Sequence, residues 1–237
     1  VISLEAWSVV KVMKTYFAAL VKHDLKAKFP YNWLTLTRSI PAGSGLGGAS
    51  SDAAALIKVL VEAQAELQDE LEDSLARLGA DIPFSYLGQP ALVTGLGDRL
   101  KPLDNSLEGI SVLLVKPNFA VSTAQAFARY DAAIAKGQSF PTTKWNSLLE
   151  SYEARDLAAM RSSARNTFIE LLDPSESCVI RDLIHKLYEE GAEYANMTGS
   201  GTCCFALFTD AENRDAVYRA FEHKRGAGYW LCKSAIR

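Results

Sequence analysis

The stretch that decides the fold is Pro41-Ala42-Gly43-Ser44-Gly45-Leu46-Gly47-Gly48-Ala49-Ser50-Ser51-Asp52. Its glycines permit positive φ angles and let a ligand come close to the backbone. Ser50, Ser51 and Asp52 can cap a helix that follows, and the N–H groups at a helix N-terminus attract anions. The stretch therefore predicts a phosphate-binding turn. The simpler alternative is a glycine-rich turn that only reverses the chain.

Two common phosphate motifs fit this stretch poorly. A Walker A loop needs lysine and then serine or threonine after its last glycine, but Ala49 follows Gly48. Gly43-x-Gly45-x-x-Gly48 matches the dinucleotide pattern, which expects an apolar parallel strand before it and an acidic residue about 20 positions later, after a second strand. Here the preceding residues 33–38 alternate apolar and polar side chains, and residues 66–72 have a helical pattern. A dinucleotide oxidoreductase is therefore disfavoured.

A third motif fits best. Pro41, Gly45, Leu46, Gly47 and Ser50 match, residue by residue, the Pro-x-x-x-Gly-Leu-Gly-x-x-Ser loop of the GHMP kinases, and the chain resembles that family. The branch that it resembles most is the diphosphocytidyl-methylerythritol kinases. The blocks similar to that branch occur in the family's order and are residues 40–55, 79–84, 90–97, 117–123, 166–168 and 197–201.

This resemblance implies an α+β fold with the two-domain GHMP architecture. Residues 1–106 would form a ribosomal protein S5 domain 2-like N-terminal domain, and residues 107–237 a ferredoxin-like C-terminal domain. It also implies ATP as phosphoryl donor, Mg²⁺ as cofactor and the 2-hydroxyl of diphosphocytidyl-methylerythritol as acceptor. Homoserine or mevalonate remains an alternative acceptor, and a nucleotide-binding protein without catalysis is an alternative of another class.

The resemblance also implies roles for individual residues. Asp81 would be the catalytic carboxylate and contact the substrate, Thr123 would line the substrate side, and Ser50 would contact the metal. The residues expected at ATP are Pro41, Ala42, Gly43, Ser44, Gly45, Leu46, Gly47, Gly48, Ala49, Ser50, Ser51, Gly199, Ser200 and Gly201. Structural roles stay open: Asp81 could cap the helix containing Pro83, Thr123 could cap a helix, and residues 199–201 could form a hairpin turn.

The family opens with a Pro-x-Lys-x-Asn segment, which is not found in this sequence, and a family asparagine is replaced near Trp7. We therefore expect the chain from Val1 to Arg237 to bind ATP weakly and to turn over slowly or not at all. Restoring such a segment should raise the activity.

Composition limits the possible partners. The 237 residues carry a net charge of −3 without a basic block, so nucleic acid is an unexpected partner. No apolar run approaches the roughly 20 residues of a membrane span. The four cysteines show neither metal-site spacing nor a dense disulfide framework, and Cys203 and Cys204 lie in an apolar run, which favours buried, reduced thiols in a cytoplasmic protein. Lys116, Arg38 and Arg99 are interpreted as solvated charges, and the sequence does not predict the oligomeric state.

Hydrophobic periodicity predicts the order of the elements. Helices are expected at 9–20, 52–64, 67–78, 122–130, 148–164 and 179–187, and strands at 33–38, 90–95 and 111–115. Residues 193–236 are expected to run strand, loop, strand, helix, strand. The pattern restarts near Ile110, which predicts a boundary at 104–108 and a mainly antiparallel sheet after it.

Overall fold

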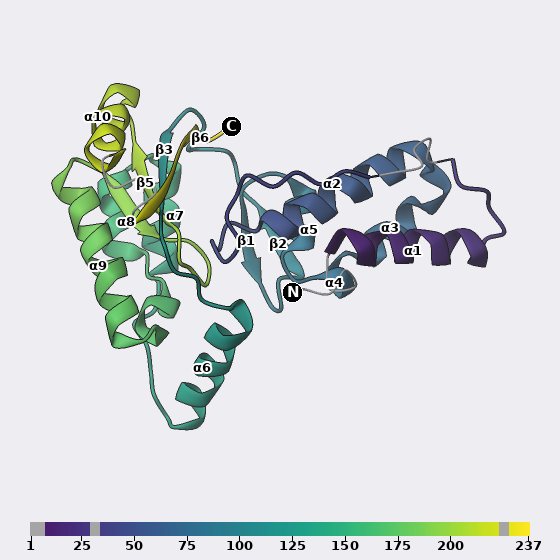
Figure 1. The fold of residues 1–237 in the computed structure, drawn as a ribbon, viewed down its shortest axis with the longest axis horizontal. Coiled ribbons are helices and arrows are strands. Elements are labelled where there is room, and N and C mark those ends of the chain that lie inside the picture. The colour runs from purple at the N-terminus through teal and green to yellow at the C-terminus, as the bar shows by residue number, and fades with distance from the viewer. Residues whose placement is uncertain (1–7, 29–33, 223–227) are drawn as a thin grey trace. The chain divides into compact units, whose positions relative to one another are not determined.

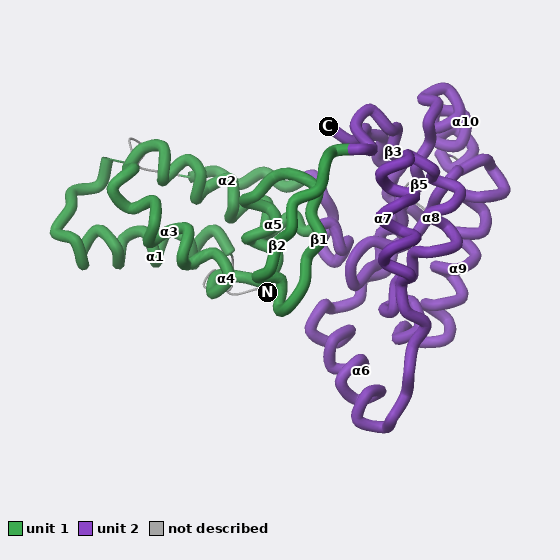
Figure 2. The backbone as a smooth tube through the Cα atoms, turned by 180° about the vertical axis from the view of Figure 1, so that it is seen from behind, with its two compact units in different colours: residues 1–38, 47–105 green, residues 39–46, 106–237 purple. Residues whose placement is uncertain are grey.

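The computed structural model describes residues 8–28, 34–222 and 228–237. The chain divides into two compact units, which Figure 2 shows in different colours. Unit 1 contains residues 1–38 and 47–105, and unit 2 contains residues 39–46 and 106–237. The glycine-rich stretch is thus divided between Leu46 and Gly47. Its first half belongs to unit 2, and its second half opens a helix of unit 1.

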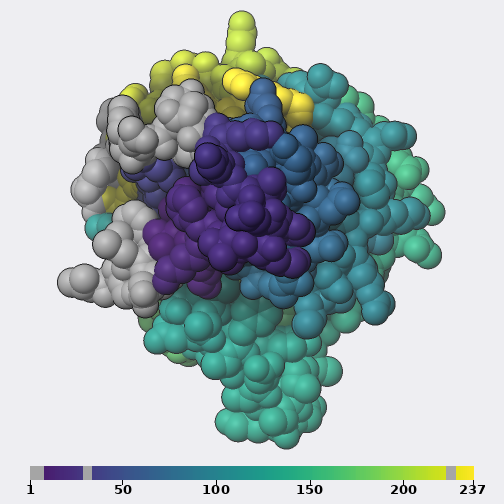
Figure 3. Space-filling model, turned by 90° about the vertical axis from the view of Figure 1, so that its right-hand side faces the viewer, coloured from purple at the N-terminus to yellow at the C-terminus, as the bar shows by residue number. Residues whose placement is uncertain are grey.

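Unit 1 consists mainly of helices (Figure 1). Its elements are α1 (Ser8–Lys22), α2 (Gly48–Ala63), η2 (Ala65–Leu67), α3 (Gln68–Asp73), α4 (Leu75–Leu78), α5 (Ile82–Leu87) and the antiparallel strands β1 (Ala91–Thr94) and β2 (Arg99–Pro102). The apolar faces of α1 and α2 form the core, where the Tyr16 hydroxyl donates to Oε1 of Gln64 at 2.9 Å. The opposite side of α1 is exposed, and α1 lies at the front of the face in Figure 3.

Unit 2 is built on a four-stranded antiparallel sheet with the order β4-β5-β3-β6. Its elements are β3 (Ser111–Pro117), α6 (Thr123–Ala135), α7 (Trp145–Glu153), α8 (Leu157–Ser163), η3 (Thr167–Leu171), α9 (Pro174–Glu189), β4 (Tyr194–Met197), β5 (Cys204–Phe208), α10 (Ala211–Glu222) and β6 (Tyr229–Ala235). The predicted antiparallel sheet and the element order after residue 193 are confirmed.

The two faces of this sheet have separate cores because side chains alternate along a strand. Leu113 and Val115 of β3 face the cluster formed with α9 and α10. Tyr194 and Leu207 face a second cluster, to which α8 contributes Leu157. The sheet therefore lies between α9 and α10 on one side and α8 on the other, with β4 as an edge strand.

Three predicted elements are wrong in detail. Residues 34–38 form no strand in the described part of the chain, and Trp33 lies outside it. Alternation predicts a buried side, but a strand also needs a hydrogen-bonding partner. The helix expected at 67–78 is interrupted at Ser74, whose hydroxyl donates to the carbonyl of Leu71 at 2.6 Å. The helix expected at 148–164 is interrupted at Arg155, which has a φ of 57°.

The expectation for the cysteines is confirmed for the neighbouring pair at the start of β5. Cys203 and Cys204 are buried free thiols, and burial raises the pKa of Cys203 to about 12. Cys178 is exposed instead. Among the helices of the described residues, none has both the length and the apolar character required to cross a bilayer.

Candidate active site

The first half of the glycine-rich stretch is hydrogen-bonded to the loop between β4 and β5. The amide of Thr202 donates to the carbonyl of Gly43 at 3.2 Å, and the amide of Cys203 donates to the carbonyl of Ser44 at 3.1 Å. Ser44 is buried, and its hydroxyl accepts from the amide of Leu46 at 3.3 Å. The turn therefore has a defined backbone conformation, fixed by groups more than 150 residues later in the chain.

Gly45 is the point of closest approach between this turn and residues 198–201. With φ at +73°, a Cβ atom on Gly45 would lie 2.3 Å from the carbonyl oxygen of Thr198 and 3.0 Å from the amide nitrogen of Gly201. The Thr198 hydroxyl also donates to the carbonyl of Gly45 at 3.2 Å. The structure thus brings together the two glycine turns that the sequence singled out, and only glycine fits at their contact.

The second half of the stretch opens α2, with Gly47 as the N-cap residue in the left-handed conformation. Among the described residues, the amides of Gly48, Ala49 and Ser50 donate no hydrogen bond. Such unused N–H groups, together with the partial positive charge at a helix N-terminus, suit an anion. A phosphate group is chemically compatible with these donors.

The predicted capping role of Ser50, Ser51 and Asp52 is wrong. The helix begins at Gly48, four residues before the expected range of 52–64, and no side chain caps it. The three residues lie in its first two turns because the glycines already permit the change of direction before them. Asp52 instead forms an ion pair with Arg38, whose Nε lies 2.9 Å from Oδ2, so Arg38 is not a purely solvated charge.

Asp81 is the N-cap residue of α5, but its side chain makes no capping hydrogen bond. Its backbone carbonyl accepts from the amide and hydroxyl of Ser85 at 3.1 and 2.9 Å. The exposed carboxylate has no hydrogen bond or ion pair with any described residue. The alternative role as a side-chain cap is therefore not realised, and the carboxylate is available for chemistry.

The turn between β1 and β2 supports the backbone next to Asp81. Gly97 has a φ of +94°, and a Cβ atom there would lie 2.4 Å from the carbonyl oxygen of Ala80. The two sequence blocks similar to the family, residues 90–97 and 79–84, therefore meet in the fold. Gly97 of the first block packs against the backbone of Ala80 in the second.

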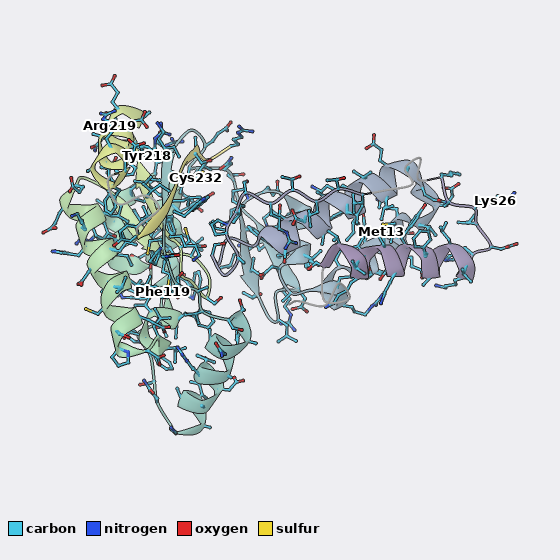
Figure 4. The ribbon with its side chains drawn as sticks, viewed as in Figure 1. Met13, Lys26, Phe119, Tyr218, Arg219 and Cys232 are labelled. Carbon is cyan, nitrogen blue, oxygen red and sulfur yellow. The ribbon has the colours of Figure 1, made fainter. Side chains whose placement is uncertain are left out.

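Lys116 was interpreted as a solvated charge, which is wrong. It is buried at the end of β3, and its ammonium group donates to the carbonyls of Pro117 at 3.1 Å and Phe119 at 2.7 Å. Burial lowers the pKa of Lys116. The Thr202 hydroxyl donates to the same carbonyl of Phe119 at 2.8 Å, and Figure 4 labels Phe119. Lys116 thus fixes the loop that leads into α6.

Thr123 is the first residue of α6 and lies beside the second glycine turn. Its hydroxyl is 3.1 Å from the hydroxyl of Ser200, which is buried. The N-cap position belongs to Ser122, which makes no side-chain capping bond. The structure therefore places Thr123 with Ser200 in unit 2, whereas Asp81 belongs to unit 1.

Asn166 supports the second glycine turn at residues 198–201, a role that the sequence alone does not predict. Its side-chain amide donates to the carbonyls of Met197 at 2.7 Å and Gly199 at 2.9 Å. Its Oδ1 accepts from the amide of Phe168 at 2.9 Å. The similarity of residues 166–168 to the family pointed to this segment. Only the fold shows that it lies against residues 197–199.

The described part of the chain offers few side chains that could bind a metal ion. No group of three or more His, Cys, Asp or Glu side chains is placed to hold a metal ion within residues 8–28, 34–222 and 228–237. Mg²⁺ in phosphoryl-transfer sites is commonly held by one or two protein groups together with the phosphates of the nucleotide. A single hydroxyl such as that of Ser50, whose own amide is one of the three unused donors, is compatible with that arrangement.

Two family models match the chain, and together they cover more than half of it. The one described as GHMP kinases N terminal domain matches residues 7–89, and the one described as GHMP kinases C terminal matches residues 149–227. The chain belongs to the GHMP kinase family. The resemblance expected from the motifs, and the two-domain α+β fold that it implied, are confirmed.

Several curated relatives in this family carry one name, 4-diphosphocytidyl-2-C-methyl-D-erythritol kinase. The relative from Ruegeria pomeroyi is 32% identical over 206 residues, which cover 86% of this chain and 70% of the relative. That from Synechococcus sp. is 35% identical over 92% of this chain and 72% of the relative. The match to the Bacteroides fragilis protein, at 38% identity, covers 75% of this chain and 61% of the relative. The chain thus spans about two thirds of the length of these relatives.

Solved structures agree with this assignment. A crystal structure of 4-(cytidine 5'-diphospho)-2C-methyl-D-erythritol kinase has a TM-score of 0.65 and 27% identity, and the match covers 98% of this chain and 80% of that one. Homoserine kinase from Cytophaga hutchinsonii has a TM-score of 0.63 at 16% identity, covering 98% and 77% of the two chains. The second similarity shows the shared fold alone.

Proposed function

We propose that the chain is an ATP- and Mg²⁺-dependent kinase that phosphorylates the 2-hydroxyl of 4-diphosphocytidyl-2-C-methyl-D-erythritol, a step of the methylerythritol phosphate route to isoprenoids. The observation that carries the proposal is the glycine-rich turn, held against residues 198–203 and followed by unused amides at the start of α2. The relatives that carry the kinase name support the choice of acceptor.

The turn and the helix that follows it would hold the phosphates of ATP. The unused backbone N–H groups of Gly48, Ala49 and Ser50 would donate to phosphate oxygens. The other residues of 41–51 and Gly199, Ser200 and Gly201 would contact ATP, and Ser50 would contribute its hydroxyl to Mg²⁺. Bound Mg²⁺ would neutralise charge that develops on the phosphates. The rigid turn contributes by positioning, which is the main requirement of phosphoryl transfer.

Asp81 would act on the acceptor. Its carboxylate would accept a hydrogen bond from the 2-hydroxyl, orient it and take its proton as the new oxygen–phosphorus bond forms and the bond to ADP breaks. Thr123 would contact the substrate from the first turn of α6.

We also propose the domain limits 1–106 and 107–237 and a cytoplasmic location. The location accords with the buried thiols of Cys203 and Cys204.

The test is the release of ADP from ATP with each of three alcohols: diphosphocytidyl-methylerythritol, homoserine and mevalonate. The chain from Val1 to Arg237 and the same chain with a family-like Pro-x-Lys-x-Asn segment before Val1 are assayed side by side. We expect ADP release with the first alcohol and faster release in the extended chain. Preference for another alcohol would overturn the proposed substrate, and ATP binding without ADP release in both forms would indicate a nucleotide-binding protein.

A further inference from the structure

A cavity of about 370 Å³ lies in unit 2 at the edge strand β4, between residues of α8 and α9. Its size is within the range of small-ligand sites. Ile169, Tyr194 and Ala195 contribute buried lining, whereas Arg161, Arg165 and Arg181 are exposed around it. Asn166 lines the cavity as well and also supports the second glycine turn, whereas Arg161, Arg165 and Tyr194 have no role in the proposed kinase site.

The cavity carries an excess of positive charge. Arg181 forms an ion pair with Glu170, with 2.7 Å between Nη2 and Oε1. Arg161 and Arg165 have no carboxylate partner among the described residues. Two guanidinium groups therefore line one cavity without a neutralising side chain, in a protein whose net charge is −3.

These two guanidinium groups are held in place by the fold. The Arg161 guanidinium lies 3.7 Å from the centre of the Tyr188 ring. The Tyr188 hydroxyl both donates to the carbonyl of Ala195 at 2.8 Å and accepts from its amide at 3.0 Å, which satisfies the outer edge of β4. Arg165 donates to the carbonyl of Ala164 at 2.7 Å. A positioned guanidinium loses less conformational entropy on binding an anion than a mobile one.

A neutral donor lies among the same lining residues. The Tyr194 hydroxyl accepts from Nδ2 of Asn196 at 3.2 Å but donates to no group in the described part of the chain. Tyr194 is only 6% exposed, and burial raises its pKa, so the phenol keeps its proton. Buried hydroxyls normally find an acceptor, and a ligand oxygen would supply one.

We propose that this cavity binds the phosphoryl group of a small phosphate or diphosphate ester, held by Arg161 and Arg165 and by the hydroxyl of Tyr194. Guanidinium groups suit phosphate because they donate two parallel hydrogen bonds to its oxygens. The alternative is that Arg161 only stacks on Tyr188 and Arg165 only covers the C-terminal carbonyls of α8. In that alternative the Tyr194 hydroxyl has no acceptor among the side chains and backbone of the described residues.

The experiment follows amide NMR shifts as inorganic pyrophosphate, and separately glycerol 3-phosphate, is added to the intact chain. Binding in the cavity should shift the amides of residues 194–196, whereas binding at the glycine-rich turn should shift those of residues 43–50. We expect the double variant Arg161→Gln with Arg165→Gln to weaken the first effect about tenfold or more, since both charged donors to the phosphate are removed. The second effect should stay unchanged.

Arg219→Gln is the matched control for the single variant Arg165→Gln, because it also removes one arginine charge, from the exposed side of α10, where Figure 4 labels Arg219. It should leave the shifts of residues 194–196 unchanged. If the double variant does not fold, Arg165→Gln alone retains the Arg161–Tyr188 stack and should still weaken binding several-fold. Absence of shifts at residues 194–196 in the unmodified chain, or equal affinity in the charge variants, would overturn the proposal. Shifts with vesicles of phosphatidic acid but not with either soluble probe would overturn the choice of a small ester.

Discussion

The glycine-rich turn and the Asp81 segment belong to the same proposed reaction but are built in opposite ways. The carbonyls of Gly43, Ser44 and Gly45 all accept hydrogen bonds from residues 198–203. The carboxylate of Asp81 is exposed and has no partner among the described residues. The proposed role of the turn therefore depends on its backbone conformation, whereas that of Asp81 depends on a single side chain.

This difference separates the expected consequences of substitution. A change within the turn should alter structure and nucleotide binding together, because both depend on the same backbone contacts. A change of the Asp81 side chain should alter catalysis alone.

Asp81→Asn should lower turnover by about 10²–10⁴-fold, the usual range for loss of a general base. The amide retains the size of the side chain but cannot take the proton of the acceptor hydroxyl. Because the carboxylate has no structural partner, the melting temperature and the ATP affinity should stay within error. Steady-state kinetics of the form with the Pro-x-Lys-x-Asn segment, with calorimetry for ATP, measure both quantities.

Asp69→Asn is the matched control, since Asp69 is another exposed carboxylate of unit 1, in the first turn of α3. It should leave turnover unchanged. If Asp81→Asn lowered the melting temperature and spared turnover, Asp81 would be a structural residue, and the contrast between the two regions would fail.

Gly45→Ala should weaken ATP binding on the order of tenfold and also lower stability. The added Cβ would lie 2.3 Å from the Thr198 carbonyl oxygen, so the two glycine turns must separate. Gly109→Ala is the control, because Gly109 has a φ of +82° in the same unit with open space around its Cβ. A Gly45→Ala protein as stable as the control, with normal ATP affinity, would show that the close packing of the turn is irrelevant.

Gly47→Val tests a second position of the glycine-rich stretch, one that is not closely packed. No atom lies within 4 Å of a Cβ placed on Gly47, although its φ of +68° makes a side chain strained by about 1–2 kcal/mol. The variant should therefore fold and bind ATP several-fold more weakly, because the valine occupies space that phosphate must approach. Calorimetric ATP affinities of Gly47→Val and Gly47→Ala, measured in parallel, separate the effect of side-chain bulk from that of backbone strain. Equal ATP affinity in all three proteins would rule out phosphate binding here.

Lys116→Met should have the smallest effect, a loss of about 1 kcal/mol or less in unfolding free energy near neutral pH. The variant loses two hydrogen bonds but also removes the burial of a charge, and Thr202 still donates to Phe119. Because burial lowers the pKa of Lys116, the unfavourable charge is lost as pH rises through the folded pKa. Chemical denaturation of both proteins should thus show the difference growing in favour of lysine at alkaline pH; a pH-independent difference would contradict this account.

Local patterns predicted much of the fold because their cause is local. The buried face of α1 follows the spacing of Val9, Val12 and Tyr16, and the alternation in β3 gives its two covered sides. The motifs also identified both glycine turns. The missing parts depend on the folded chain. Lys116 is buried although its hydrogen bonds reach only the loop that directly follows it, and Asn166 supports Gly199 from 33 positions earlier in the sequence. The division of the glycine-rich stretch between the two units is likewise a property of the fold.

The central claim is transfer of phosphate from ATP to one particular hydroxyl, and the phosphorus spectrum of the product tests it most directly. The 2-hydroxyl of the methylerythritol moiety is on a carbon that bears the methyl group and no hydrogen. The account therefore predicts a new monoester resonance that is not split by a carbinol proton, formed only with ATP, Mg²⁺ and diphosphocytidyl-methylerythritol. A monoester resonance split by carbinol protons would contradict it. So would the absence of any new monoester resonance in the reactions of both the Val1–Arg237 chain and its extended form.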